Sequence, residues 1–523
     1  MSKLIFIFLT IALSYALKAQ NLEMGPMLET PYKSFTPQIL ELRNGLLYAA
    51  DFEKSEHFSE ALPDEIILQV YNQNTLDLKL NVQIEPREVF ERRQSVSLME
   101  VALLGNYFVC FYRGFTPTGN LVEVYAQRVN SQTGAVEVLD TIFSKKVQHP
   151  GELESEAIIY QKLGLLNLCM NTTKSRILIH HIALSPSSED YIERVLLLDE
   201  NLAPLLTRDF ILRNPEDGMA MNKLVDSQGS VYSYSNRKMV MLDFTRGYQR
   251  LEQPIPDKLI PANAFVRQLC ATIHDNGNIA WAGLYGTVDL EDTEENKDAS
   301  ETRRGDTQIE GVVYLEVDAA TKQLKRTRRS KFSEDLINEF LNEELMKYHL
   351  DTEINDVFTS FEFFRVQDFS CLIGEAADYN NPAGVNYNDL LLTTFDEMGE
   401  VLWVHRLPKL QSYGPVNRAT GYLSFSDDET LYILFQDDLE NFEEGVRKVY
   451  DLRKANHHKY LIPVLYSFNK ETGNFLYEPK LNWKFGKDLK ILPAQAYQSE
   501  EGEPVYVFLR GDENYRLSRF SLY

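Results

Sequence analysis

The sequence is poor in positive charge, cysteine and tryptophan. Its 523 residues include 53 Lys and Arg against 77 Asp and Glu, which gives a formal net charge of −24, and only four Cys and three Trp. A protein that binds nucleic acid needs a basic face for the phosphate backbone. The charge balance therefore predicts no nucleic-acid partner.

The few cysteines do not form a disulfide framework. Cys110, Cys169, Cys270 and Cys371 each stand inside an apolar, strand-like run such as YFVCFY or RQLCATI. A free cysteine in such a run behaves as a small buried hydrophobic residue. We expect four free thiols, and Cys110–Cys169 would be the first candidate if any pair were bridged.

After its first residues, the sequence has no apolar run of membrane-spanning length. The start, MSKLIFIFLTIALSYALKAQ, has a basic residue at Lys3, an apolar run from Leu4 to Leu17 and a small residue at Ala19. That run is shorter than the roughly 20 residues of an ordinary span, and the order is that of a signal peptide. We expect residues 1–19 to be removed, the mature chain to have no transmembrane segment, and the protein to be periplasmic, on the cell surface or secreted.

Catalytic signatures are missing as well. The sequence contains no His-Glu-x-x-His, no Gly-x-Ser-x-Gly and no phosphate-binding glycine loop. Carboxylates are plentiful, but their spacing does not show that any pair converges. The sequence therefore indicates no metal site and no cofactor, and it leans against an enzyme.

What the sequence does contain is a recurring strand–turn–strand unit. Its copies lie at residues 66–82, 124–139, 194–210, 313–327, 391–407 and 464–479. In each copy an apolar run ends at Asn or Asp, whose side chain can accept hydrogen bonds from the amides of the following turn. Gly134, Gly399 and Gly473 end the turns of the best copies, where a short hairpin loop needs a positive φ.

Each copy is preceded by two further extended runs, the second often rich in aromatics, as in NYFVCFYRG (106–114). Four strands thus recur at a spacing of roughly 50–75 residues. Strands that are apolar on both faces must be covered on both sides, and a ring of four-stranded sheets does this. The sequence predicts an all-β chain that folds as one β-propeller of four-stranded antiparallel blades.

We count eight such units. They cover residues 35–84, 95–142, 154–212, 217–255, 265–332, 358–409, 419–481 and 491–523. The eighth lacks an outermost strand, which the segment NLEMGPMLET near the start can supply. Seven blades is the alternative if the short fourth unit belongs to its neighbour, and a tandem pair of β-sandwiches is the competing fold.

We expect residues 20–523 to form this single domain, interrupted by three insertions. Residues 333–351 have apolar residues at helical spacing after Ser333, which predicts one short inserted helix. The stretches 287–310 and 439–459 are highly charged. All three join the second strand to the third, or one blade to the next, and such joins share one face of a propeller, where loops carry binding residues.

The second strand of each unit should end at this insertion-bearing face, around the mouth of a central funnel. The residues at those ends are Arg113, Tyr285, Tyr379, Asp437 and Asp438. Aromatics with acids and an arginine can stack on and hydrogen-bond a sugar or a peptide. We take these five as candidate ligand-binding residues; ordinary strand-end residues are the alternative interpretation.

Two resemblances accompany these patterns. NDLLLTTFDEMGEVLWVHRLPKLQ, with GNIAWAGLYG and GVVYLEVDAATK before it, resembles a large family of exported, uncharacterised propeller-like proteins of Bacteroidetes, best over 265–481. A weaker resemblance is to quinoprotein-type propeller repeats, because Asp396, Gly399 and Trp403 match their turn and docking pattern. The first implies the fold and export without an activity. The second implies that Trp403 docks one blade on the next, and the missing vicinal cysteine pair leaves the quinone cofactor without support.

Two functions fit these observations. The first is a binding or scaffold module of the cell envelope, which would be a monomer with a protein, peptide or glycan ligand. The alternative is a glycan-active or other hydrolytic enzyme with its site in the funnel, since a propeller fold by itself does not assign a function.

Overall fold

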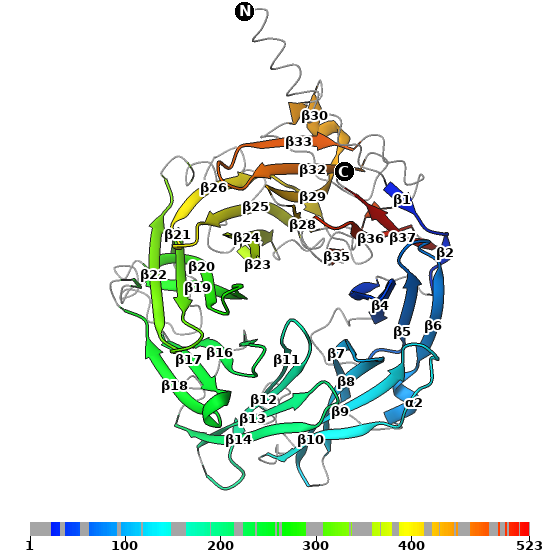
Figure 1. Cartoon of the computed structure of the whole chain (residues 1–523), viewed down its shortest axis with the longest axis vertical. Coiled ribbons are helices and arrows are strands. Elements are labelled where there is room, and N and C mark those ends of the chain that lie inside the picture. Colours follow the sequence, from blue (N-terminus) through cyan, green and yellow to red (C-terminus); the bar gives the residue numbers. More distant parts are fainter. Residues whose placement is uncertain are drawn as a thin grey trace, which may run out of the picture.

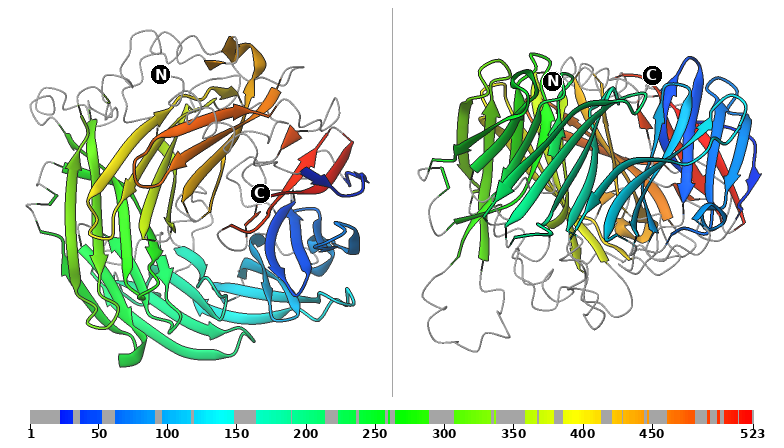
Figure 2. Two further views of the ribbon diagram at one scale, coloured as in Figure 1. Left: turned by 45° about the horizontal axis from the view of Figure 1, so that its top comes forward. Right: turned by 90° about the horizontal axis from the view of Figure 1, so that it is seen from below.

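The computed structural model shows a closed ring of eight antiparallel sheets around a central axis (Figure 1). In seven of the sheets the strands lie in chain order, with the first strand nearest the axis and the last at the rim. Figure 2 shows the ring from two further directions. This is an eight-bladed β-propeller. The predicted fold class is confirmed, with eight blades rather than seven and without a tandem sandwich.

The described part of the chain covers most of every blade. It comprises residues 22–31, 37–52, 62–90, 96–116, 119–147, 164–188, 190–213, 223–235, 238–256, 259–260, 264–288, 307–333, 336, 358–366, 368–378, 386–412, 421–427, 429–443, 446–447, 461–480, 490–491, 497–498, 502–511 and 513–521. The predicted signal peptide lies outside these residues.

The first four blades follow the predicted units closely. Their strands are, for blade 1, β3 (Gln38–Arg43), β4 (Leu46–Phe52), β5 (Ile66–Asn72) and β6 (Leu78–Ile84); for blade 2, β7 (Val96–Leu104), β8 (Tyr107–Thr116), β9 (Leu121–Asn130) and β10 (Asp140–Lys146); for blade 3, β11 (Leu165–Met170), β12 (Arg176–Leu184), β13 (Tyr191–Asp199) and β14 (Pro204–Leu212); and for blade 4, β15 (Lys223–Val225), β16 (Val231–Ser235), β17 (Lys238–Asp243) and β18 (Gln249–Pro254).

The second half of the ring repeats this arrangement. Its strands are, for blade 5, β19 (Ala264–Ile273), β20 (Ile279–Val288), β21 (Thr307–Val317) and β22 (Leu324–Lys331); for blade 6, β23 (Phe358–Val366), β24 (Phe369–Asp378), β25 (Asn386–Phe395) and β26 (Val401–Leu407), with β27 (Gln411–Ser412) beside β25; for blade 7, β28 (Leu423–Ser426), β29 (Thr430–Asp438), β32 (Leu461–Asn469) and β33 (Phe475–Pro479); and for blade 8, β34 (Lys490–Ile491), β35 (Tyr497–Gln498), β36 (Val505–Arg510) and β37 (Asn514–Phe520).

Blade 8 is completed by the start of the described chain. β1 (Leu22–Met24) runs antiparallel to β37 with Leu22 opposite Phe520, and β2 (Leu28–Glu29) pairs with the beginning of the same strand. The blue and red ends of the chain therefore share one blade (Figure 1). The prediction that this early segment closes the ring is confirmed.

The turns follow the predicted chemistry. Asn72, Asn130, Asp199, Asp318, Asp396 and Asn469 each accept hydrogen bonds from amides of the turn that they begin. Gly134, Gly399 and Gly473 have φ values of 73°, 76° and 69°. In the other three copies Leu76, Leu202 and Lys322 take the same left-handed conformation without a glycine.

The hydrophobic core lies between blades rather than inside one. Among the described residues it forms eight clusters, and each draws its members from two neighbouring blades. This explains why central strands such as β5 and β12 are apolar on both faces. Burying both faces stabilises neighbouring blades together.

The predicted insertions lie largely outside the described residues. β20 and β21 extend into the first, since Val288 pairs with Thr307, and the start of the third forms a 3₁₀ turn, η5 (Leu439–Asn441), and a small hairpin of β30 (Phe442–Glu443) and β31 (Val446–Arg447). Of the predicted helix, the structure describes Leu336, which packs between blades 5 and 6. The described α-helix is α2 (Pro86–Phe90), between blades 1 and 2.

The four cysteines are free, as expected. Within the described residues we find no helix with the length and apolar character needed to cross a membrane.

Candidate functional site

The five predicted ligand-binding residues belong to four different blades, and the structure describes four of them. Arg113 is half-buried on β8 and its Nη2 donates to the carbonyl of Gly164, at 3.4 Å, where blade 3 begins. Tyr285 is buried in the core between blades 4 and 5, with the guanidinium carbon of Arg329 5.5 Å from its ring centre. Tyr379 lies outside the described residues. A role of these residues in ligand binding stays a prediction.

Asp437 and Asp438 lie at the end of β29, where both support the following turn. Asp437 is buried, and its Oδ1 accepts hydrogen bonds from the amide of Asp438, at 2.8 Å, and from Nδ2 of Asn441, at 2.6 Å. Asp438 accepts from the amide of Glu440 at 2.9 Å and caps η5. Both aspartates therefore stabilise the turn after β29, at the position where the sequence predicted a ligand contact.

A buried group of charged residues lies beside Asp437, between blades 6 and 7. We call Glu375, Asp389, Arg406, Lys409 and Gln411 the Lys409 cluster. The Lys409 ammonium donates to the Glu375 carboxylate and, at 3.1 Å, to Oε1 of Gln411. Asp389 accepts from the amide of Lys409, at 3.0 Å, and from Nε of Arg406, at 2.7 Å. The sequence analysis missed this cluster, because only the third dimension brings β24, β25 and the β26–β27 connection together.

The charged groups of the Lys409 cluster stabilise one another and connect blade 6 to blade 7. Burial lowers the pKa of Lys409, and the carboxylates of Glu375, Asp389 and Asp437 oppose that shift. Gln411 continues the link into blade 7, since its Nε2 donates to the carbonyl of Gln436 at 2.8 Å. The described charged groups of the cluster bind one another, so they stabilise the junction of blades 6 and 7.

A different carboxyl lies nearer the axis of the ring. Glu362 is on the innermost strand β23 and is open to solvent, and its Oε2 accepts a hydrogen bond from Ser424 of β28 at 2.8 Å. Desolvation of the carboxyl raises the pKa of Glu362, while hydrogen bonds from Ser424 and Tyr422 oppose the shift. A carboxyl with a raised pKa can donate a proton near neutral pH.

A second buried charged group joins blades 3 and 4. His180 and Glu193 are both fully buried, and His180 Nε2 lies 2.9 Å from Glu193 Oε1. Arg250 of blade 4 donates to the other oxygen of Glu193 and, at 2.8 Å through its Nε, to Glu252. Burial lowers the pKa of His180 to about 4, against the effect of the Glu193 hydrogen bond. The imidazole is therefore neutral at physiological pH and contributes to the blade junction.

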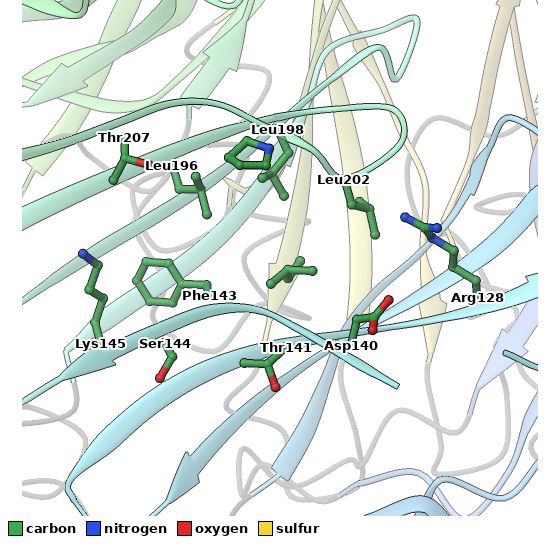
Figure 3. A pocket seen from close by; sticks show the side chains of 12 residues that line it. Arg128, Asp140, Thr141, Phe143, Ser144, Lys145, Leu196, Leu198, Leu202 and Thr207 are labelled. Carbon is green, nitrogen blue, oxygen red and sulfur yellow. The ribbon is translucent and has the colours of Figure 1, made fainter. Parts of the chain in front are cut away.

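An open groove of about 550 Å³ lies between the outer parts of blades 2 and 3 (Figure 3). It is lined by Arg128, Asp140, Thr141, Ile142, Phe143, Ser144, Lys145, Leu196, Leu198, Leu202, Pro204 and Thr207. The leucines come from the β13–β14 hairpin and face Phe143 of β10, whereas Arg128, Asp140 and Lys145 lie along the β10 side (Figure 3). We call this feature the 2–3 groove.

The 2–3 groove arises from the fan shape of the blades. Near the axis the two sheets are closely packed by residues such as Val124, Ile177 and Ile179, all fully or almost fully buried. Toward the rim the sheets diverge, and the buried side chains of Leu196, Leu198 and Phe143 form the apolar floor of the groove. An apolar floor with a few polar groups at its edge is the usual lining of a binding site.

Among the described residues, no three His, Cys, Asp or Glu side chains form a group that could bind a metal ion.

Comparisons with known proteins concern the fold and not the activity. No family model and no curated protein matches the sequence. Among solved structures, the chain is similar to the Dos1 propeller, at 8% identity and a TM-score of 0.42 over 96% of each chain. It is also similar to the β-propeller domain of the trilobed protease from Pyrococcus furiosus, at 9% identity and a TM-score of 0.30 over 82% of this chain and 96% of that one.

A further similar structure is the polysaccharide lyase Uly1, at 11% identity and a TM-score of 0.32 over 81% of this chain and 89% of that chain. Such low values carry no argument about activity. They also lend no support to the specific resemblances to a Bacteroidetes family or to quinoproteins. The propeller assignment rests on the sheet topology of this chain itself.

Proposed function

We propose that this protein is a binding or scaffold module of the cell envelope. The observation that carries the proposal is the 2–3 groove, an open concavity with an apolar floor and charged edges. The charged clusters around Lys409 and His180, by contrast, are buried in blade junctions and bind their own neighbours. The rigid ring thus offers a surface for recognition, while much of its buried charge stabilises the scaffold.

The ligand class under this proposal is a protein, a peptide or a glycan. The expected signal peptide supports a site of action in the periplasm, on the cell surface or outside the cell. Asp438 at the end of β29 and Arg113 near the end of β8 are half-buried and remain reachable members of the predicted set. With these two residues, the proposed binding surface also includes the insertion-bearing face.

The test is binding of the mature chain to glycan and peptide arrays, followed by the variants Arg113→Ala and Asp438→Ala. Specific binding without chemical change of the ligand is the expected result. Loss of that binding in either variant would place the site on the insertion-bearing face. Unchanged binding in both would remove the predicted residues from the site.

The second candidate function is hydrolysis, and one observation favours it. Glu362 combines solvent access, a raised pKa and hydrogen-bonding neighbours near the axis, as a general acid requires. A panel of chromogenic glycosides and esters, with Glu362→Gln as the comparison, separates the two functions. Turnover that Glu362→Gln abolishes would establish the enzyme and overturn the scaffold.

A further inference from the structure

The 2–3 groove is bordered by a strand with an open edge. β14 is the last strand of its sheet, bonded on one side to β13, and no described strand pairs with its other side. In an antiparallel edge strand, alternate N–H and C=O groups point away from the sheet and can pair with another chain. The nine residues of β14 offer such an edge over about 30 Å.

Two exposed apolar side chains lie near the two ends of β14. Ile211 is 78% exposed, which is extreme for isoleucine, and Leu205 is 40% exposed. Ile211 lies opposite Ile192 and has the same facing as Thr207, which lines the groove. Asp209 lies between Ile211 and Thr207 on this face, so the exposed apolar side chains of β14 are separated along its open edge. An extended peptide with alternating side chains can span such separated positions, whereas a compact small molecule would not.

Charge on the facing wall restricts the ligand further. Lys145 and Arg128 project from the β10 side of the groove, where Asp140 is the acidic lining residue. Two cations against one carboxylate make this wall net positive on a chain with a formal net charge of −24, which favours an acidic side chain of the ligand. Asp209 of β14 lies opposite Arg194 of β13 and interacts with it electrostatically.

We propose that the 2–3 groove binds an extended polypeptide segment, which adds to the open edge of β14 as a further strand. A bulky apolar side chain of the segment occupies the groove over Leu196, Leu198 and Phe143. A neighbouring acidic side chain pairs with Lys145. This inference rests on the proposed binding function and gives it a partner class and a surface.

The experiment begins with a displayed library of linear twelve-residue peptides selected on the full mature chain. The expected consensus has apolar residues at alternate positions and one acidic residue. The enriched peptide is then synthesised with a fluorophore, and its affinity is measured by anisotropy. Ile211→Asp and Lys145→Glu are each expected to weaken binding at least tenfold, because the first replaces an exposed apolar contact by a charge and the second reverses the charge at the wall.

Matched controls carry the same changes elsewhere on the rim. Leu476→Asp alters a 64% exposed apolar residue of β33, and Lys79→Glu reverses an exposed lysine of β6, the outermost strand of blade 1. Both should change the affinity less than twofold. A peptide whose acidic residue is replaced by lysine should regain affinity for Lys145→Glu.

Strand addition has its own signature. Methylating alternate backbone amides of the peptide should abolish binding in one of the two possible phases and spare it in the other, because only alternate N–H groups face β14. Equal effects of both phases would overturn strand addition. So would a dimer of this chain that Ile211→Asp converts to a monomer, since β14 would then be covered by a second copy.

These experiments distinguish a failure of the groove proposal from a failure of the proposed binding function. If peptides bind the parent protein and both variants, Ile211→Asp and Lys145→Glu, with the same affinity, the groove proposal fails and the proposed binding function stands. If neither the library nor the arrays yield any specific ligand, both fail.

Discussion

The indole nitrogen of Trp403 donates a hydrogen bond of 2.8 Å to the backbone carbonyl of Lys470, which belongs to the next blade. The indole also stacks on Phe468, with ring centres 5.7 Å apart and planes inclined by 11°. Trp403 therefore joins blade 6 to blade 7, as its position four residues after a turn glycine predicted.

This contact belongs to a recurring mode of docking. The third-to-fourth-strand turn of one blade lies against the outer part of the preceding blade: a Cβ added at Gly473 would lie 2.6 Å from Cγ of Trp403, and one added at Gly399 would lie 2.3 Å from Cδ1 of Tyr314. The glycines thus serve two needs at once. They adopt a positive φ, and they leave space for an aromatic ring.

The first prediction concerns Trp403 itself. Trp403→Ala should lower the free energy of unfolding by about 3–5 kcal/mol, because it removes a large buried ring and its interblade hydrogen bond. Urea unfolding of the purified variant measures this. Leu402→Ala, at an exposed neighbour, is the control and should stay within about 0.5 kcal/mol of the parent protein. A cost below 1 kcal/mol for Trp403→Ala would contradict the docking role.

The second prediction separates backbone strain from close packing at turn glycines. Gly399 and Gly502 have almost equal φ values of 76° and 80°, but no atom lies within 4 Å of a Cβ added at Gly502. Gly502→Ala should cost about 1–2 kcal/mol from the left-handed backbone alone. Gly399→Ala should cost about 1–3 kcal/mol more, because the methyl group meets Tyr314. Equal costs in denaturant unfolding would show that the ring moves aside freely.

The third prediction concerns ring closure. Deleting residues 22–29 removes β1 and β2 and leaves β37 as an open edge. The thermal midpoint should fall and the variant should associate at high concentration, because an exposed edge strand is a template for pairing. Calorimetry and light scattering measure the two effects. A monodisperse variant with the parent midpoint would show that β1 contributes nothing to closure.

The fourth prediction is a pH dependence that originates at His180. Burial lowers its pKa from 6.5 to about 4, so below pH 6.5 the unfolded chain takes up a proton that the folded protein does not bind. Stability is therefore lost as the pH falls from 6.5 toward 4, by about 2 kcal/mol at pH 5. His180→Gln should lose correspondingly less stability between pH 7.5 and 5. Identical slopes for the two proteins in urea titrations would remove His180 as the cause.

The fifth prediction tests the Lys409 cluster as a structural link. Lys409→Met leaves Glu375 buried without its cation and should cost about 3–5 kcal/mol. The double variant Lys409→Met/Glu375→Leu should recover much of this loss, since an apolar pair removes the stranded charge. A double variant that is less stable than Lys409→Met would show that the ion pair itself holds the junction.

Local chemistry allowed much of the fold to be predicted from the sequence. Strands that are apolar on both faces, turns that begin at Asn or Asp, and the spacing of the units depend on neighbouring residues, and they predicted four-stranded blades in the observed order. The closing role of residues 22–29 followed from counting strands, because the last unit lacked one.

The candidate site was much less predictable. The sequence placed Arg113, Tyr285, Asp437 and Asp438 at strand ends, but it could not tell that the Tyr285 ring turns into the core or that Asp437 binds Asn441. Those outcomes depend on the twist of each strand and on what the neighbouring blade presents.

The sequence by itself thus determined the repeated unit, the turn chemistry and the absence of familiar catalytic motifs, since each is encoded within a few dozen residues. Only the tertiary structure decided where Lys409 and Glu375 meet, how Glu362 approaches Ser424, and that blades 2 and 3 diverge into a groove. The physical reason is that contacts between blades join residues far apart in the chain. Their geometry is fixed only when the whole ring closes and every apolar face is buried against the next.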